Sequence, residues 1–284
     1  MTQPTPRFEN PVRFLTPRPV RPEAPLFIFL PGMDGTGQLL RTQLAGLERS
    51  FDIRCLSIPP WDLTDWGGLV QQVSDLIAAE AKEKSQRSVY LCGESFGGCL
   101  ALQVLTHAPQ LFERVVLVNP ASSFRRLLWM RLGATLSLWT PKSFYRIGMK
   151  ALVPFLSEQA RMGRSDRQAL WDAMNSVPAK TAAWRMSLLN SFAVERLPLE
   201  RMTHPVLLIT GANDRLLPSK EEGKRLVSRL PNAQMVVLPH SGHACLLETD
   251  VNLYEILHRA DFIDAHAKSH SIRASRPPDD RYSK

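Results

Sequence analysis

The chain has 284 residues, of which 44% are hydrophobic and 22% are charged. A chain of this length and composition buries a large core unaided, which excludes a disordered, collagen-like or coiled-coil protein. No run reaches the ~18 uncharged apolar residues of a membrane-spanning helix, and residues 1–22 lack the apolar centre of a secretory signal. The four cysteines show neither a CxxC pair nor framework spacing. We interpret them as reduced thiols and expect a cytoplasmic protein.

The formal net charge is +8, which by itself would suit a nucleic-acid-binding protein. Most of the excess lies in residues 121–200, where there are 12 Lys or Arg against 5 Asp or Glu, together with four of the six tryptophans. No zinc-finger, RNP-type or helix-turn-helix pattern accompanies this charge, so we expect no nucleic-acid partner. Arginines mixed with large apolar residues in Phe124–Trp139 suit a peripheral contact with a membrane; the alternatives are an apolar pocket lining or a plain local core.

From residue 26 onward, short apolar runs alternate with stretches of helical spacing. The runs are Leu26–Leu30, Ile53–Ile58, Ser88–Cys92, Val115–Val118, Val206–Thr210 and Met235–Leu238. They are continuous rather than alternating, as expected for parallel strands that are buried on both faces. The helical stretches are Leu39–Leu47, Leu69–Ala81, Gly97–Ala108, Ser219–Leu230 and Leu246–Ala260. This alternation predicts an α/β fold with a mostly parallel central sheet and helices on both faces.

One interval breaks the alternation. Residues 121–201 contain no convincing strand, are rich in helix formers, and lie between two predicted strands. We predict that they form an inserted helical cap. The core then comprises residues 25–120 and 202–264, preceded by an N-terminal arm, 1–24, and followed by a disordered basic tail, 265–284.

The segment Gly93-Glu94-Ser95-Phe96-Gly97 matches G-x-S-x-G and lies between a predicted strand and a predicted helix. A serine hydroxyl is a poor nucleophile, and a sharp strand-to-helix turn presents it to a base and a substrate. Such a turn strains the serine backbone and is tolerated only where the close neighbours are small, which explains Gly93 and Gly97. We predict Ser95 as the catalytic nucleophile. The alternative is an ordinary helix N-cap.

A serine nucleophile needs donors for the oxyanion that forms on the substrate. The amide of Phe96, at the start of the following helix, suits one donor. The second is expected from the loop after Leu26–Leu30, where Gly32 lets the backbone turn and the amide of Met33 face the site. The alternative is a glycine-rich turn without a role. Asp34 follows Met33 directly, and its side chain is expected either to stabilise the turn or to approach the active site.

On this architecture the acid and the histidine follow the serine in that order. Asp214 comes directly after the strand Val206–Thr210, where an orienting acid belongs. Two histidines follow the last strand. His243, between Gly242 and a predicted helix, is the predicted base, and His240 is the alternative. No cluster of His, Cys and carboxylates has ligand spacing, so neither a metal nor a cofactor is expected.

With these motifs in order, the chain resembles the α/β-hydrolase superfamily from about Leu26 to Phe262. The loop Leu30-Pro31-Gly32-Met33-Asp34-Gly35-Thr36-Gly37 resembles the esterase/lipase/thioesterase domain of the plant and cyanobacterial phytyl ester synthase family. Members of that family are implied to move acyl chains onto phytol or diacylglycerol. Long members add an acyltransferase domain with an H-x-x-x-x-D motif, which this sequence lacks.

Three functions therefore remain open. The first is a serine hydrolase that cleaves a lipophilic carboxylic ester or thioester, a small-molecule substrate, through an acyl-enzyme on Ser95. The second is an acyltransferase that passes the same acyl group to phytol or another lipid alcohol. The third, from another class, is a non-catalytic module that keeps the fold and binds a lipid or a protein partner. An intact Ser95, Asp214 and His243 favours the first two over the third.

Overall fold

A computed structural model describes residues 11–82, 87–127, 155–156 and 158–263. At its centre is a seven-stranded sheet in the order β1-β3-β2-β4-β5-β6-β7. The strands are β1 (Arg13–Leu15), β2 (Leu26–Leu30), β3 (Asp52–Ser57), β4 (Val89–Glu94), β5 (Arg114–Val118), β6 (Val206–Gly211) and β7 (Ala233–Leu238). Strands β2 to β7 are parallel, and β1 pairs antiparallel with β3. The predicted α/β architecture is confirmed.

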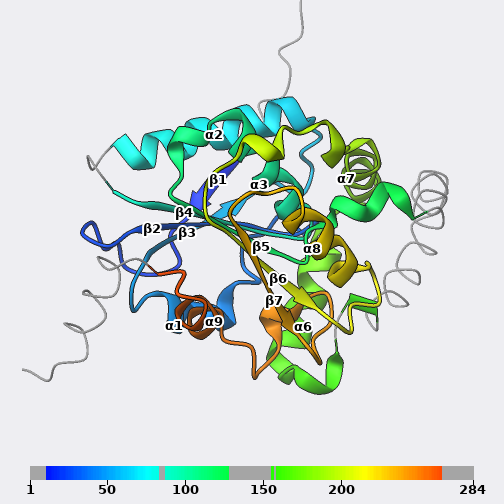
Figure 1. Cartoon of the computed structure of the whole chain (residues 1–284). Helices are drawn as coiled ribbons and strands as arrows, with labels where there is room; N and C mark the ends of the chain where they lie inside the picture. The colour runs from blue at the N-terminus through cyan, green and yellow to red at the C-terminus, as the bar shows by residue number, and fades with distance from the viewer. Residues whose placement is uncertain (1–10, 83–86, 128–154, 157, 264–284) are drawn as a thin grey trace, which may run out of the picture.

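Both faces of the sheet are covered, which explains why the strands are continuous apolar runs. On β2, Ile28 belongs to one core cluster, whereas Phe27 and Phe29 belong to another on the opposite face. Helices α2 (Trp66–Lys82), α3 (Phe96–His107) and α8 (Ser219–Val227) pack into the first cluster. Helices α1 (Leu44–Leu47) and α9 (Leu253–Arg259) pack into the second, on the other side of the sheet (Figure 1).

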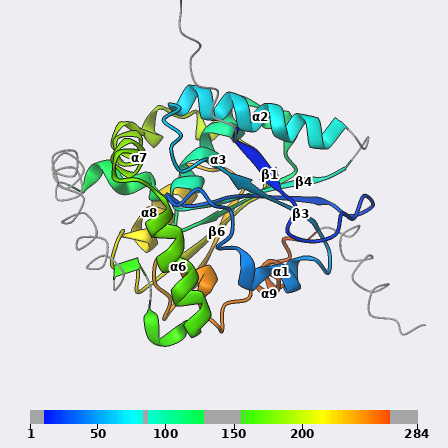
Figure 2. The same cartoon turned by 180° about the vertical axis from the view of Figure 1, so that it is seen from behind.

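Two helices are described between β5 and β6, the interval predicted as a cap. Helix α7 (Ala179–Ser191) packs into the same core cluster as α2 and α3, and α6 (Arg164–Ser176) joins a third, smaller cluster (Figure 2). Short 3₁₀ helices complete the fold: Arg41–Gln43, Pro109–Leu111, Ala121–Arg126, Gln159–Arg161, Val194–Arg196, Leu199–Arg201 and Cys245–Leu247. Most of Phe124–Trp139, considered for membrane contact, and the predicted tail, 265–284, lie outside the described residues.

Three segments differ from the sequence prediction. The helix expected over Leu39–Leu47 is the 3₁₀ turn Arg41–Gln43 followed by the four residues of α1. The helix expected over Leu246–Ala260 is a 3₁₀ turn followed by α9, because the side chain of Asn252 accepts a hydrogen bond from the amide of Glu255 and starts a new helix. Strand β1 was not predicted. It has three residues, all intermediate or exposed, so it lacks the apolar run that identified the buried strands.

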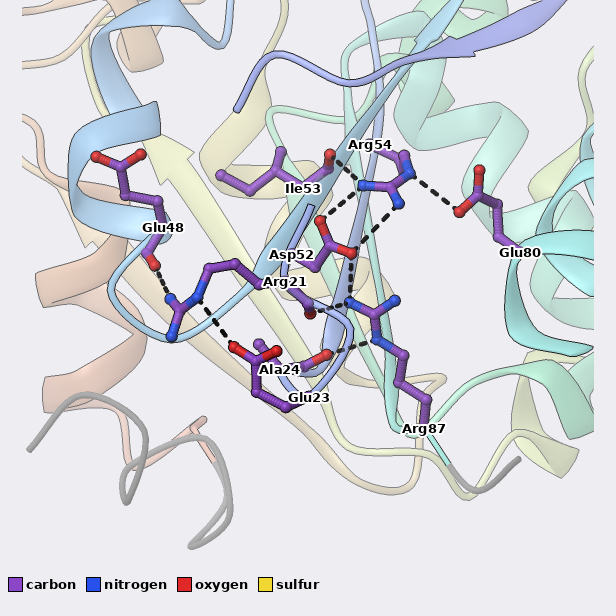
Figure 3. Close-up of polar contacts among 9 residues, drawn as sticks. All are labelled: Arg21, Glu23, Ala24, Glu48, Asp52, Ile53, Arg54, Glu80 and Arg87. Carbon is purple, nitrogen blue, oxygen red and sulfur yellow. Dashed lines mark hydrogen bonds and ion pairs between the residues drawn. The ribbon is translucent and has the colours of Figure 1, made fainter. Parts of the chain in front are cut away.

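A charged cluster lies at the amino end of the sheet (Figure 3). The Asp52 side chain is fully buried and accepts hydrogen bonds from Arg54 at 2.7 Å and from Arg87 at 2.6 Å. Arg87 also donates to the carbonyl oxygens of Arg21 and Ala24. The cluster therefore joins β3 to the segment before β4 and to the segment before β2.

Within the described residues, no helix is long and apolar enough to cross a bilayer. The four cysteines are all buried and unpaired. Burial raises the pKa of their thiols, that of Cys55 to about 12, so these side chains behave as small core residues.

Candidate active site

Ser95 lies on a strained turn between β4 and α3. Its backbone has φ 53° and ψ −111°, in a region that side-chain-bearing residues rarely adopt. A Cβ on Gly93 would lie 2.3 Å from the carbonyl oxygen of Gly97, and a Cβ on Gly97 would lie 2.0 Å from that of Leu30. Only glycine can occupy either position. The turn thus holds the Ser95 hydroxyl above the carboxyl end of β4, packed against the loop that follows β2.

His243 is the histidine that reaches the serine. Its Nε2 lies 2.8 Å from Ser95 Oγ, whereas His240, the alternative, is exposed on the same loop after β7. His243 Nδ1 lies 2.7 Å from Asp214 Oδ2. With the Nδ1 proton donated to Asp214, Nε2 is left to accept the hydroxyl proton of Ser95. Burial would lower the pKa of His243, but the charge of Asp214, its hydrogen bond and the charge of Glu94 raise it above its ordinary value.

Asp214 is held in a turn after β6. Its Oδ1 accepts hydrogen bonds from the amides of Leu216 and Leu217 at 2.9 and 3.0 Å, and Ser219 Oγ donates to Oδ2. Burial by itself would raise the pKa of this carboxyl, but the His243 charge and these hydrogen bonds hold it below its ordinary value. Asp214 is therefore an ionised acceptor with a fixed orientation.

Asn119, which follows β5, was missed by the sequence analysis. Its side chain is fully buried and donates to the carbonyl oxygens of Gly242 at 3.1 Å and His243 at 2.7 Å, and it accepts from the amide of Gly211 at 2.8 Å. It thereby ties the histidine loop to the end of β6. A polar residue directly after a buried parallel strand is the signal that could have identified it.

The histidine loop has a second support. The amide of Gly242 donates to Glu248 Oε1 at 2.8 Å, and Arg161, in the segment between β5 and β6, donates to Glu248 Oε2 at 2.9 Å. Glu248 is almost fully buried. The His243 ring is thus held by its own bond to Asp214, and the loop that carries it is held by Asn119 and Glu248.

The loop after β2 forms a closed turn beside Ser95. The amide of Gly35 donates to the carbonyl oxygen of Gly32 at 3.0 Å, and a Cβ on Gly32 would lie 3.8 Å from Ser95 Cβ. The amide of Met33 shares a peptide plane with the Gly32 carbonyl and so points the opposite way. The amide of Phe96 is at the first position of α3, where no intrahelical acceptor exists. The Met33 amide is therefore not used by the hydrogen bond of the turn, and the Phe96 amide is not used by a hydrogen bond within the helix.

Two further carboxyl groups lie next to the nucleophile. Asp34 Oδ2 accepts from the amide and hydroxyl of Thr36 at 2.8 and 2.5 Å, the turn-stabilising arrangement considered for it, while Asp34 Oδ1 lies on the side of Gly32. Glu94 is 7% exposed. Burial raises its pKa to about 8, a shift opposed by the His243 charge and increased by Asp34. Desolvation likewise raises the pKa of Asp34, against its bonds to Thr36 and the charge of Arg185.

The geometry brings together Ser95, His243 and Asp214 from three different loops at the carboxyl end of the sheet, with Met33 and Phe96 beside the serine. In the part of the chain that the structure describes, no three His, Cys, Asp or Glu side chains are grouped as a metal ion would require. The arrangement is suited to nucleophilic attack on a carbonyl carbon by the serine hydroxyl, with the histidine as the proton carrier.

Comparisons with known proteins place the chain in a family. Residues 59–250 match the family described as serine aminopeptidase, S33 (Hydrolase_4). Phytyl ester synthases 1 and 2, chloroplastic, of Arabidopsis thaliana are 32% and 28% identical over 275 and 260 residues, or 87% and 82% of this chain. The chain spans 39% and 37% of the length of these two relatives.

The fold has solved counterparts. The structure of a hydrolase from Oleispira antarctica superimposes with a TM-score of 0.70 at 16% identity, covering 84% of this chain and 92% of that one. At 16% identity this similarity shows a shared fold only. The family is shown by the sequence match of residues 59–250. The chain therefore belongs to the serine aminopeptidase S33 family, within the α/β-hydrolase superfamily.

Proposed function

We propose that the protein is a serine hydrolase that cleaves a lipophilic carboxylic ester or thioester through an acyl-enzyme on Ser95. The observation that supports this most directly is the hydrogen-bonded series from Ser95 Oγ through the His243 ring to Asp214, with distances of 2.8 and 2.7 Å. At these distances a proton can pass from Ser95 Oγ to His243 Nε2 without any movement of the side chains.

In acylation, His243 Nε2 takes the hydroxyl proton as Ser95 Oγ forms a bond to the carbonyl carbon. The carbonyl π electrons move onto oxygen, and the resulting oxyanion accepts hydrogen bonds from the amides of Met33 and Phe96. The intermediate then collapses, the bond to the leaving group breaks, and His243 donates its proton to the departing alkoxide or thiolate. Asp214 stabilises the imidazolium throughout.

Deacylation repeats these steps with water. His243 takes a proton from the water as its oxygen attacks the acyl carbon, and the same two amides stabilise the second oxyanion. Collapse releases the carboxylic acid and returns the proton to Ser95 Oγ. The anionic Glu94 would oppose this negative charge, so a pKa near 8, which keeps Glu94 neutral at pH 7, favours both oxyanions.

The lipophilic class of substrate is supported by the side chains around the turn. Met33 and Trp66 are partly buried and pack against the core cluster that includes Phe96 and Phe124. The phytyl ester synthase relatives are named for an ester of a long isoprenoid alcohol. We propose further that residues 121–201 act as the cap over this site and shape the acyl pocket.

The second candidate is an acyltransferase, which the 32% identity to phytyl ester synthase 1 favours. The acyl-enzyme is the same, but the hydroxyl of phytol or another lipid alcohol replaces water in the second half-reaction. The outcome then depends on which nucleophile occupies the site after the first product leaves.

The test uses p-nitrophenyl esters of increasing acyl length, with and without phytol, on the wild type and on Ser95→Ala. We expect a burst of p-nitrophenol equal to the enzyme concentration, an optimum in chain length, and no burst from Ser95→Ala. Phytyl ester formed at the expense of free acid identifies the acyltransferase. A fluorophosphonate probe that fails to label Ser95, together with no turnover, would contradict both and favour the non-catalytic binding module.

A further inference from the structure

Helix α7 is linked to both residues whose amides form the proposed oxyanion hole, to one directly and to the other through a tryptophan. It reaches Met33 directly through Arg185 and reaches Phe96 through Trp66. Arg185 and Leu188, the two positions of α7 that make these contacts, are three residues apart and therefore lie on one face of the helix.

The Arg185 guanidinium is buried, with 2% of the residue exposed. Its Nη1 donates to the carbonyl oxygen of Met33 at 2.7 Å and its Nη2 donates to that of Pro59 at 2.9 Å. The approach is possible because Gly35 has no side chain: a Cβ there would lie 2.7 Å from Nη1. A buried cation that donates to two backbone carbonyls from separate loops fixes the distance between those loops.

The Met33 carbonyl is the middle peptide of the turn Gly32–Gly35. In a four-residue turn the middle peptide can rotate between two orientations while the outer hydrogen bond stays closed. The bond from Arg185 selects one of them. It fixes the peptide between Met33 and Asp34 and anchors Met33 to the segment after β3, while the Gly32–Gly35 hydrogen bond orients the preceding peptide, which carries the Met33 amide. Together these bonds set the place of the Met33 amide and of the Asp34 carboxyl relative to Ser95.

The contact with Phe96 is made through an aromatic ring. Trp66, the first residue of α2, stacks on the Phe96 ring with centroids 4.7 Å apart, and its Nε1 donates to the carbonyl oxygen of Leu188 on α7 at 2.9 Å. Its ring also meets Phe192, directly after α7, edge-on at 5.9 Å. The neighbouring Trp184 donates to Thr64 at 3.1 Å, a second link between α7 and the segment before α2.

We infer that α7 positions the oxyanion hole, with Arg185 as the positioning residue for the Met33 amide and Trp66 for the Phe96 amide. This inference rests on the proposed function, since it assigns a role to contacts with that site. Its consequence is that the segment between β5 and β6 acts on the rate of the chemical step, in addition to any contact that it makes with the substrate.

The test compares Arg185→Met with Lys180→Met, which removes an exposed cation from the same helix. Both are assayed with the p-nitrophenyl ester that the wild type cleaves fastest, and kcat is expressed per site labelled by a fluorophosphonate. We expect Arg185→Met to lower kcat about 10- to 100-fold with KM within about threefold, because a misplaced donor weakens only the transition state. Lys180→Met should match the wild type, and Arg185→Lys should recover part of the loss.

A second measurement separates positioning from folding. An alkyl trifluoromethyl ketone forms a tetrahedral oxyanion on Ser95, whereas the matching methyl ketone serves as a ground-state control. In Arg185→Met and in Trp66→Leu, the inhibition constant of the trifluoromethyl ketone should rise in parallel with the loss of kcat/KM, while that of the methyl ketone stays unchanged.

Other outcomes overturn the inference. If KM rises at constant kcat, Arg185 contacts substrate or only packs the segment. If activity falls only in proportion to the labelled fraction, its role is structural. An unlabelled, inactive wild type removes the proposed function and this inference together, whereas an active wild type with an equally active Arg185→Met removes this inference alone.

Discussion

Each end of the sheet holds a buried carboxyl group, Asp52 at the amino end and Glu94 at the carboxyl end, and the pKa values of the two are shifted in opposite directions. At the amino end, Asp52 accepts hydrogen bonds from Arg54 and Arg87 (Figure 3), and although burial would raise its pKa, these arginines hold it below its ordinary value. At the carboxyl end, burial raises the pKa of Glu94 to about 8, and the neighbouring Asp34 adds to the shift. Asp52 is thus ionised at the amino end, whereas Glu94 is neutral at pH 7 at the carboxyl end, near the ionised Asp214.

The difference separates stability from activity. A buried carboxylate enclosed by arginines joins segments of the fold, and losing either partner leaves an uncompensated charge. A neutral carboxylic acid next to Ser95 leaves the space where the oxyanion forms free of negative charge. Carboxyl groups whose pKa is strongly raised by burial are concentrated at functional sites, where the reaction requires a shifted protonation state.

The two ends also respond to pH with opposite signs. The pKa of Asp52 is lowered on folding, so its contribution to the free energy of unfolding is present above its unfolded pKa and is lost as the pH falls through the folded value. The pKa of Glu94 is raised, so its contribution is present at low pH and is lost as the pH rises through about 8. Acid removes the contribution of Asp52, and alkali removes that of Glu94.

The largest expected effect is at the carboxyl end. Asp214→Asn should lower kcat by about 10³- to 10⁴-fold, because the amide favours the wrong tautomer of His243 and no longer stabilises the imidazolium. The melting temperature should change little by comparison. Steady-state kinetics on p-nitrophenyl esters and a thermal melt measure the two quantities, and a loss of less than tenfold would contradict the role of Asp214.

At the amino end the expected effect is on stability alone. Asp52→Ala leaves Arg54 and Arg87 buried without their carboxylate, and we expect the free energy of unfolding to fall by about 3–5 kcal/mol with kcat within about twofold. The control is Glu80→Gln, which affects the more exposed partner of Arg54 and should cost at most about 1 kcal/mol. Urea unfolding measures both, and equal losses would show that burial is unimportant here.

Asn119 tests whether the carboxyl end also depends on buried polar contacts. Its backbone has φ 40°, which glycine adopts freely, so Asn119→Gly removes the side chain without adding strain. We expect kcat to fall by about 10- to 100-fold, because the His243 loop loses two of its hydrogen bonds. Kinetics well below the melting temperature measure this, with the exposed Asn232→Gly as control. An unchanged kcat would mean that the remaining contacts of the loop, among them that with Glu248, hold His243 in place.

The smallest expected effect is that of Glu94→Gln. Above pH 8 the ionised Glu94 of the wild type opposes the oxyanion, so kcat/KM should decline there, and the neutral amide should remove this decline and give a severalfold advantage at pH 9. The free energy of unfolding of the variant should also fall less between about pH 5 and pH 8. Identical pH profiles for the two proteins would show that Glu94 does not ionise in this range.

The sequence predicted the six parallel strands well and missed the antiparallel edge strand β1. A strand covered on both faces must be apolar throughout, so β2 (Leu26–Leu30) was predicted with its observed bounds. Strand β1 has three residues at an edge and lacks this signal. The helix expected from Leu246 is interrupted because Glu248 turns inward to the Gly242 amide, a contact that no local pattern reveals.

Within the site, predictability depended on whether a residue belongs to a recognisable local motif. Ser95, Asp214 and His243 each follow a predicted strand in a short motif, so each could be identified from its neighbours in the sequence. The structure brings the three side chains into contact. Asn119 and Arg185 act on residues more than 120 positions away. In the sequence, Arg185 is one cation among many in a basic segment, and only the folded chain shows that it lies against Met33.

The order of the strands has a consequence for biosynthesis. Beyond β2, the strands β4, β5, β6 and β7 are added to one side of the sheet in the order in which the ribosome releases them. The nucleophile follows the first of these strands, the acid follows the third, and the histidine follows the last. Under the proposed mechanism, a nascent chain displays the Ser95 turn long before His243 can reach it. Activity would then begin only when the final strand has docked, and it would report completed folding.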